Sequence, residues 1–299
     1  MSKNKKRTNA EFVAKRRQVG ILVTLILIVS LVIIFIGYKL WLTYNNSPEK
    51  IAARFIDAFT EYRSTDMQRY TTQSFWKENG GYYEAVSHAL GVLADNIAKD
   101  KGLPKAMLKP QLKMEVPPIS EWRLVKTSTF YVFSYDGPIT ITFPESQTLS
   151  NSRVDVKVDF VLRVCKEKNG WKVCDFKRQR KYASWTAYEF LEARMAANTN
   201  HLESMLCSKA DESIKDYIDA YDIMVHDPAG DSNYAWIVSH IATLNIKGDR
   251  AYISYGLYKV SSQDPTKPIL KWKYVDVREH LLMCKENGVW YIKGIYFEN

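Results

Sequence analysis

The sequence predicts an α+β fold, in which an N-terminal transmembrane helix precedes two tandem domains, each made of helices followed by an antiparallel meander. Three observations support this prediction. Residues 19–38 contain no charged side chain. Residues 53–70 resemble residues 188–205 at a constant offset of 135. Each half of the remaining chain ends with the same pattern, Cys-Lys-Glu followed by Asn-Gly and Trp, which indicates an internal duplication.

The predicted anchor is the stretch VGILVTLILIVSLVIIFIGY, twenty residues from Val19 to Tyr38. A helix of that length extends about 30 Å, which matches the hydrocarbon core of a bilayer. Tyr38, Trp41 and Tyr44 follow at the spacing of a membrane-interface belt. No small-residue cleavage site follows the apolar stretch, so we expect the anchor to stay on the chain.

The charge distribution predicts the topology. The basic tail, residues 1–18, carries seven Lys and Arg, which predicts that it lies in the cytoplasm and that residues 45–299 lie outside it. The predicted localisation is the bacterial cytoplasmic (inner) membrane, with a single pass and the lipid bilayer as a partner. Of the net charge of +9, residues 1–44 account for +7 and leave +2 for the rest, which argues against direct nucleic-acid binding.

Two α+β domains are predicted, at residues 45–182 and 183–299, with residues 19–44 as anchor and interfacial belt. Four apolar positions match at the offset of 135: Phe55 with Phe190, Ile56 with Leu191, Ala58 with Ala193, and Met67 with Leu202. Helices are expected at residues 48–62, 65–73, 80–99, 184–198, 200–208 and 211–225.

Antiparallel strands are expected after the helices of each half. In the first half, residues 122–135 are expected to turn at Asp136-Gly137 into residues 138–143, and a hairpin around Asn169-Gly170 follows. In the second half, the expected strands are residues 234–246, 250–260, 269–284 and 289–297.

The hairpin VDFVLRVCKEKNGWKVCDF brings two cysteines together. With Asn169-Gly170 as the loop, Cys165 faces Cys174 on the polar face of the strand pair, which predicts a disulfide in an oxidising compartment. Cys284 would face Tyr291 in the last hairpin, and Cys207 ends a short helix. Because Cys284 is expected to point away from the helices, two separate thiols are favoured for this second pair.

The order of elements resembles the nuclear-transport-factor-two-like cone fold, used twice in residues 47–299. A membrane anchor followed by two such domains resembles the TcpC-like conjugation proteins, which are similar to the bitopic assembly subunits of type IV secretion systems. The resemblance implies a non-enzymatic scaffold whose partners are other membrane or envelope proteins of a transfer machine, and it allows self-association. It carries over no catalytic residue.

No catalytic, cofactor-binding or metal site is predicted, since the sequence lacks a phosphate-binding glycine loop, a nucleophile elbow and paired metal-ligand spacings. One alternative is an isomerase- or dehydratase-like enzyme, because the cone fold also builds such pockets. Its candidate residues are His88, Asp227, His240 and His280.

A second alternative is an extracytoplasmic binding module for a wall glycan, a peptide or a lipid. Aromatic residues alternate on the expected strands and could line a binding surface: Tyr82, Tyr83, Tyr131, Phe133, Tyr135, Tyr252, Tyr255 and Tyr258. A binding module should have a deep apolar pocket. A scaffold should have a filled interior and an exposed apolar or mixed patch.

Overall fold

The computed structural model describes residues 26–39, 41, 44–101, 113–142, 153–195, 198–215, 218, 235–262, 270–275 and 279–297. The chain divides into two compact units, Met1–Lys50 and Ile51–Asn299. We describe each unit separately, and we call residues 51–182 the first half and residues 183–299 the second half of the larger unit.

The first unit corrects the predicted fold class. Among the residues described, no helix is both long enough and apolar enough to cross a membrane. Residues 26–39 form a helix. The predicted transmembrane helix is therefore wrong for the described chain. Residues 19–25 of that prediction lie outside the described residues.

Five helices occur near predicted positions, whereas only residues 211–215 and 218 of the helix expected at residues 211–225 are described. α2 (Pro48–Thr60) begins with a proline, and the Ser47 hydroxyl accepts a hydrogen bond from the Lys50 N–H at 3.3 Å, a typical helix start. The other helices are α3 (Ser64–Tyr70), α4 (Gln73–Lys101), α5 (Ala183–Met195) and α6 (Thr199–Ser204).

The two halves correspond in these helices. α5 occupies the positions of α2 shifted by 135 residues, and α6 begins 135 residues after the start of α3. Shortly after each second helix, a residue at the same offset of 135 makes a parallel bridge to the last strand of its own half, Thr71 to Val173 and Leu206 to Ile292. The larger unit nevertheless remains a single compact unit, so the boundary at residues 182 and 183 stays a prediction.

The first half contains one antiparallel sheet. Its strands are β1 (Lys113–Glu115), β2 (Arg123–Lys126), β3 (Phe130–Thr142), β4 (Arg153–Glu167) and β5 (Gly170–Gln179), with the short helix η2 (Ile119–Glu121) before β2. The order is β1-β3-β4-β5, and β2 also pairs with β3. Both β1 and β2 lie on the side of β3 opposite β4.

The turn predicted at Asp136-Gly137 is wrong, because both residues lie inside the continuous strand β3. β1 pairs with residues 140–142 of β3 and β2 with residues 131–134, so Pro138 lies between them. A proline is tolerated there because its missing N–H has no neighbouring strand to bond on that side. The actual turn lies at residues 127–129, where the Thr127 hydroxyl accepts a hydrogen bond from the Phe130 N–H at 3.0 Å.

The second half contains the other sheet, of order β10-β9-β7-β6 with β8 also paired to β7. Its strands are β6 (Ala235–Lys247), β7 (Arg250–Ser262), β8 (Leu270–Val275), β9 (Glu279–Glu286) and β10 (Val289–Phe297). β8 and most of β9 lie within the single strand expected at residues 269–284 and both pair with β7, and residues 276–278 between them lie outside the described part of the chain. Asn287 and Gly288 have positive φ angles of 51° and 83°, as the tight turn of a hairpin requires.

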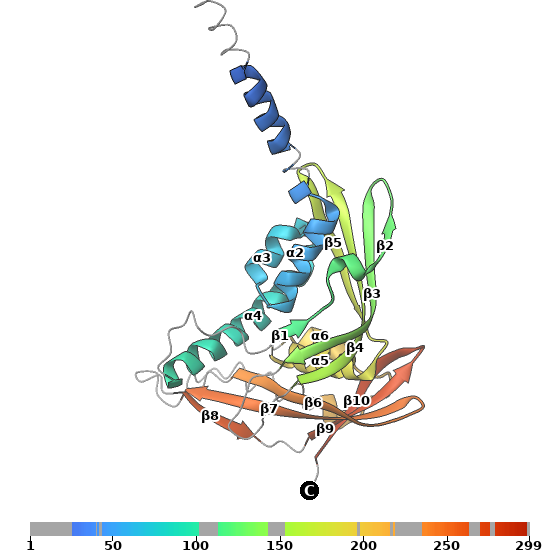
Figure 1. Cartoon of the computed structure of the whole chain (residues 1–299). Coiled ribbons are helices and arrows are strands. Elements are labelled where there is room, and N and C mark those ends of the chain that lie inside the picture. The colour runs from blue at the N-terminus through green and yellow to red at the C-terminus, as the bar shows by residue number, and fades with distance from the viewer. Residues whose placement is uncertain are drawn as a thin grey trace, which may run out of the picture. The chain divides into compact units, whose positions relative to one another are not determined.

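The core of the first half is aromatic. Alternate residues of β4 are fully buried, and Phe160 lies at their centre. Its ring lies 6.0 Å from that of Phe59 on α2, 5.5 Å from that of Phe176 on β5, and 5.1 Å from that of Trp185 on α5. Since α5 belongs to the second half, the two halves share this core. Figure 1 shows α5 and α6, in yellow, between the two sheets.

Replacing Phe160 by Ala is expected to reduce the free energy of unfolding by about 3–5 kcal/mol, because it leaves a cavity against three rings. Val125→Ala on β2, where the side chain is 50% exposed, is the control and is expected to change it by less than about 0.5 kcal/mol. Urea denaturation followed by tryptophan fluorescence measures both. Equal effects of the two substitutions would contradict a shared core centred on Phe160.

Candidate functional site

Helix α5 is buried on every side. All ten residues from Trp185 to Arg194 are buried, and the helix contacts β4 of the first sheet and β6, β7 and β10 of the second. A helix in that position is normally apolar all round. This one carries three ionisable side chains, Glu189, Glu192 and Arg194, which are 5%, 1% and 4% exposed. Their charges therefore require partners inside the protein.

Arg178 of β5 supplies the positive charge for both carboxylates. Its guanidinium donates a hydrogen bond to Glu192 Oε2, and its second terminal nitrogen lies 3.5 Å from Glu189 Oε1. The side chains of Arg178, Glu189 and Glu192 are 7%, 6% and 1% exposed. Because Arg178 belongs to the first half and the glutamates to the second, this buried ion cluster joins the halves.

Two tyrosines of α4 surround the guanidinium. Its central carbon lies 5.0 Å from the ring centre of Tyr82 and 5.9 Å from that of Tyr83, as in cation–π contacts. The Tyr82 hydroxyl donates a hydrogen bond to Glu192 Oε2. Burial, and next the charge of Glu192, raise the pKa of Tyr82 well above its usual value. Burial likewise raises the pKa of Tyr83 to about 12, so both hydroxyls keep their protons at neutral pH.

His201 of α6 closes the cluster on its other side. Its Nε2 lies 3.1 Å from Glu189 Oε1, and its ring centre lies 5.1 Å from that of Tyr82. The Asn198 side chain caps α6 by accepting a hydrogen bond from the His201 N–H at 3.0 Å. Burial alone would raise the pKa of Glu189, but Arg178 and the His201 hydrogen bond hold it below its usual value. Glu189 therefore stays ionised.

A tyrosine pair extends the polar interior toward α2. The hydroxyls of Tyr62 and Tyr188 are hydrogen-bonded to each other, and both side chains are buried. Burial raises the pKa of Tyr62 and that of Tyr188 well above their usual values. Arg178 is charged and both glutamates are paired with it. The ion pairs therefore hold β5 and α5 together.

Sequence reasoning missed this cluster. The signal was present in the segment Tyr-Glu-Phe-Leu-Glu-Ala-Arg at residues 188–194, where ionisable residues interrupt an otherwise apolar helix. The repeat gave a second signal, because the aligned segment of α2 has Arg54, Asp57 and Phe59 in place of Glu189, Glu192 and Arg194. Neither signal names Arg178, whose position depends on how β5 packs against α5.

The candidate residues of the enzyme alternative lie on separate elements. His88 is exposed on α4, and His280 is half-buried on β9. His240 lies on β6, but its side chain is outside the described part of the chain, as is Asp227. Among the aromatic candidates, Phe133 and Tyr255 are buried, whereas Tyr252 is 42% exposed.

The structure joins Cys165 to Cys174 by a disulfide, with the two Cα atoms 5.8 Å apart. Next to the turn, the strand register differs from the predicted one by two residues, because the loop lies one residue earlier in the chain. Glu167 pairs with Gly170, so the loop is Lys168-Asn169 and Cys165 lies opposite Lys172. Arg163 pairs with Asp175 and Val164 with Val173, which leaves Cys174 as the extra residue of a β-bulge. The bulge brings Cys174 back toward Cys165.

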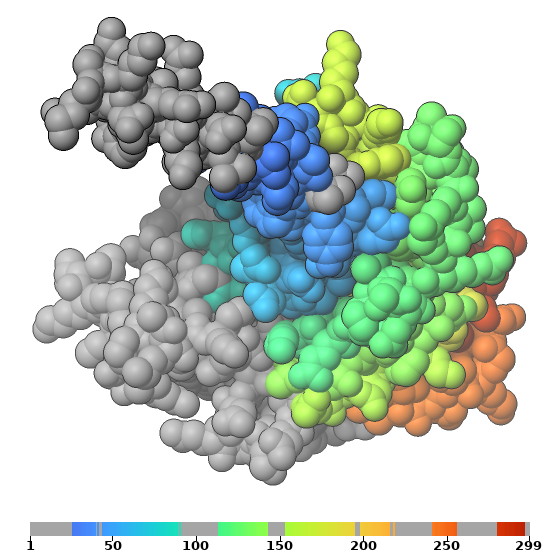
Figure 2. Space-filling model, turned by 45° about the horizontal axis from the view of Figure 1, so that its top comes forward, coloured from blue at the N-terminus to red at the C-terminus, as the bar shows by residue number. Residues whose placement is uncertain are grey.

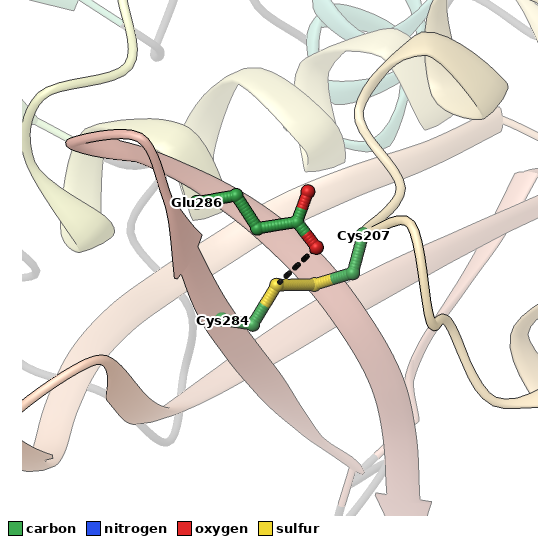
Figure 3. Close-up of side chains that lie close together, drawn as sticks. All are labelled: Cys207, Cys284 and Glu286. Carbon is green, nitrogen blue, oxygen red and sulfur yellow. Dashed lines mark hydrogen bonds between the residues drawn. A yellow bond between two sulfur atoms is a disulfide. The ribbon is translucent and has the colours of Figure 1, made fainter.

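The expectation of two separate thiols at Cys207 and Cys284 is wrong, because a second disulfide joins them with the Cα atoms 6.5 Å apart (Figure 3). Cys284 does lie opposite Tyr291, as the hairpin count predicts. However, the chain after α6 runs along the outer edge of β10, where the Cys207 N–H bonds to the Ile292 carbonyl at 2.8 Å. Cys207 therefore lies at the sheet edge, where a Cys284 pointing away from the helices can reach it.

Glu286 lies beside this disulfide and is the third member of a possible metal-ligand group, whose ligand atoms lie within 4.8 Å of one another (Figure 3). Metal ligation requires cysteine thiolates, and both sulfurs are bonded to each other here. Glu286 Oε1 instead accepts hydrogen bonds from the Ser208 N–H at 3.0 Å and the Ser208 hydroxyl at 2.7 Å. These hydrogen bonds connect Ser208, in the chain after α6, to β9.

The three residues predicted at a membrane interface all lie in the first unit. Tyr38, Trp41 and Tyr44 are 55%, 59% and 62% exposed. The rings of Tyr38 and Trp41 stack at 6.2 Å, and the Lys50 ammonium lies 4.8 Å from the ring centre of Tyr44. The large apolar side chains of residues 26–36 are also exposed, each by at least 49%.

Comparison with known proteins gives limited similarity. No protein-family model and no curated protein matches the chain. A solved structure described as an NTF2-like protein involved in plasmid conjugation matches with a TM-score of 0.24 and 10% identity, over 62% of this chain and 78% of that one. A SEC-C motif containing protein from Rhodopseudomonas palustris matches with a TM-score of 0.26 and 12% identity, over 41% of this chain and 83% of that one. TM-scores this low carry no argument about fold or function.

Replacing Arg178 by Met is expected to lower the free energy of unfolding by about 3–5 kcal/mol, because two buried carboxylates lose their cation. The matched control is Lys177→Met on the same strand, where the lysine side chain is 65% exposed and 3.6 Å from Asp175; its effect should stay below about 1 kcal/mol. Adding Glu189→Gln and Glu192→Gln to the Arg178 variant should restore part of the loss. Chemical denaturation of the wild-type chain and of these three variants measures their free energies of unfolding. Indistinguishable denaturation midpoints for the two Met variants would contradict a stabilising role of the cluster.

The two disulfides are expected to stabilise the protein unequally, because they close loops of different length. Cys207 and Cys284 are 77 residues apart, whereas Cys165 and Cys174 are 9 apart. Replacing Cys207 and Cys284 by Ala should lower the free energy of unfolding by about 4 kcal/mol. Replacing Cys165 and Cys174 by Ala should lower it by less than about 3 kcal/mol. Denaturation of the two double variants tests the order, and non-reducing peptide mapping tests the pairing. Free thiols in protein from its native cells would contradict both bonds.

Proposed function

We propose that this chain is a non-enzymatic scaffold that recruits partner proteins in an extracytoplasmic complex, and that the complex is a conjugative or type IV transfer machine. The observation that carries the proposal is the buried ion cluster of Arg178, Glu189 and Glu192, because it joins β5 of the first sheet to α5 of the second half within one compact unit. A body of this kind presents surfaces at constant relative positions, which is what a partner-recruiting protein needs.

The aromatic core of the first half supports a scaffold over a ligand-binding module. The rings of Phe59, Phe160 and Phe176 contact one another with centres 5.0–6.0 Å apart, and Trp185 of the second half packs on Phe160. Exposed apolar side chains lie on β6 and β7 of the second sheet, among them Leu244, Ile246 and Tyr252.

The two disulfides support the extracytoplasmic location. Disulfides persist in the periplasm and on the cell surface but are rare in the cytosol, and all four cysteines of the chain are paired. The lipid bilayer stays a proposed partner of the first unit, because a helix with exposed aliphatic side chains on all faces needs an apolar surface to cover it.

The specific assembly rests on the resemblance of the sequence to TcpC-like conjugation proteins. The correspondence of α2 with α5, and of the bridges at Thr71 and Leu206, supports the duplication on which that resemblance depends. Conjugation also occurs in the description of one solved structure with partial similarity, but that similarity adds no weight.

The experiment is deletion of the gene from its native cell, complemented by the tagged full-length chain. We expect deletion to reduce transfer of the conjugative element at least a thousandfold and complementation to restore it. In-cell crosslinking of the tagged chain should recover other subunits of the transfer channel.

Normal transfer after deletion would contradict the proposed assembly. Recovery of the chain without protein partners but with a bound glycan, peptide or lipid would instead favour the binding-module alternative. Turnover of a small molecule by the purified chain would favour the enzyme alternative.

A further inference from the structure

Within the described part of the chain, strand β6 has a free edge. It is the end strand of the second sheet and pairs only with β7 among the described strands. Residues 242–247, the second part of the strand, are all exposed. A strand in this position leaves backbone N–H and C=O groups unpaired along one side, where another extended chain can add to the sheet.

The free edge is also apolar. Leu244 and Ile246 are 56% and 55% exposed, and on the adjacent strand Tyr252 is 42% exposed opposite Asn245. A register shift between Thr243 and Asn245 makes Leu244 the extra residue of a β-bulge, which changes the direction of its side chain. Figure 2 shows the tip of β6 and β7, in orange, at the surface of the molecule.

Two cations face each other at the same tip. Lys247 and Arg250 are directly opposite in the register of β6 and β7, and both are exposed. Within the described part of the chain neither forms an ion pair, although Asp249 lies in the turn between them. Like charges directly opposite on two strands destabilise the pair, so a carboxylate supplied from outside would find two adjacent cations without competition.

A second copy of the chain fits this edge poorly. A second copy would bring another Lys247 and Arg250 to a tip that already has excess positive charge, and like charges placed close together destabilise a pairing. The chemistry of the edge therefore selects a different chain that carries acidic residues.

We propose that the free edge of β6 binds an extended, apolar and acidic segment of a partner protein, which adds to the second sheet as a further strand. Main-chain hydrogen bonds hold the segment, Leu244 and Ile246 contact its apolar side chains, and Lys247 and Arg250 bind its carboxylates. This inference rests on the proposed function as a partner-recruiting protein and assigns the surface that does the recruiting.

The test uses the full chain and two labelled peptides, Val-Glu-Val-Glu-Val-Glu and Val-Lys-Val-Lys-Val-Lys, with fluorescence anisotropy as the readout. The glutamate peptide is expected to bind at least tenfold more tightly. The double variant Lys247→Glu with Arg250→Glu should invert this preference, and Ile246→Asp should weaken binding of the glutamate peptide at least tenfold. Binding should also slow hydrogen exchange of the amides of residues 242–247.

The matched controls lie on β2 of the first sheet. Val125 is 50% exposed there, and Lys126 lies 5.5 Å from the ring centre of Tyr131 instead of opposite a second cation. Val125→Asp and Lys126→Glu should leave both peptide affinities within twofold. Circular dichroism melts of every variant separate loss of binding from loss of folding.

Three results would overturn the proposal: no binding of the glutamate peptide, equal binding of both peptides, or a preference that the double variant leaves unchanged. Sedimentation showing a dimer that the double variant dissociates would assign the edge to a second copy instead. If in-cell crosslinks to transfer subunits persist in a β6 variant, only this surface is wrong. If those crosslinks are also missing from the wild-type chain, the proposed function fails with it.

Discussion

The fold of the larger unit depends on one buried arginine. Arg178, on the last strand of the first sheet, lies between Glu189 and Glu192 on the first helix of the second half. A buried carboxylate without a cation is strongly destabilising, so neither half can bury its share of the cluster alone. The ionic constraint therefore acts across the two halves, and it explains why a chain with two sheets and a repeated helix pair folds as one compact unit.

The position of α5, which carries both glutamates of the cluster, also separates the interior of the larger unit from the surfaces that a partner can reach. α5 contributes Trp185 to the aromatic core of the first half and Arg194 to a hydrogen bond with Tyr255 of β7 at 3.3 Å. The Cys165–Cys174 disulfide joins the two strands of the β4–β5 hairpin, and the Cys207–Cys284 disulfide joins the chain after α6 to β9. With the helix and both hairpins held in place, the exposed edge of β6 and the tip of β7 are left as surfaces that a partner can reach without rearranging the core.

Local patterns were predicted well where one interaction decided them. The start of α2, the tight turn at Asn287-Gly288 and the pairing of Cys284 with Tyr291 all follow from nearby residues. The register of the Asn169-Gly170 hairpin is a local prediction that failed, and two other failed predictions required knowledge of distant segments. Asp136-Gly137 looks like a turn until β1 and β2 are seen on either side of Pro138. Cys207 looks separate from Cys284 until the chain after α6 is seen along β10.

The sequence by itself determined the α+β content, the offset of 135 between the helix pairs and the position of one disulfide, because periodicity and turn chemistry act over a few residues. The tertiary structure alone decided that Arg178 meets Glu189 and Glu192, that Cys207 meets Cys284, and that β6 is left as a free edge. These contacts join residues distant in sequence, and their energies come from burial and from charges brought together in a medium of low polarity. Only the packing of α5 between two sheets creates that medium.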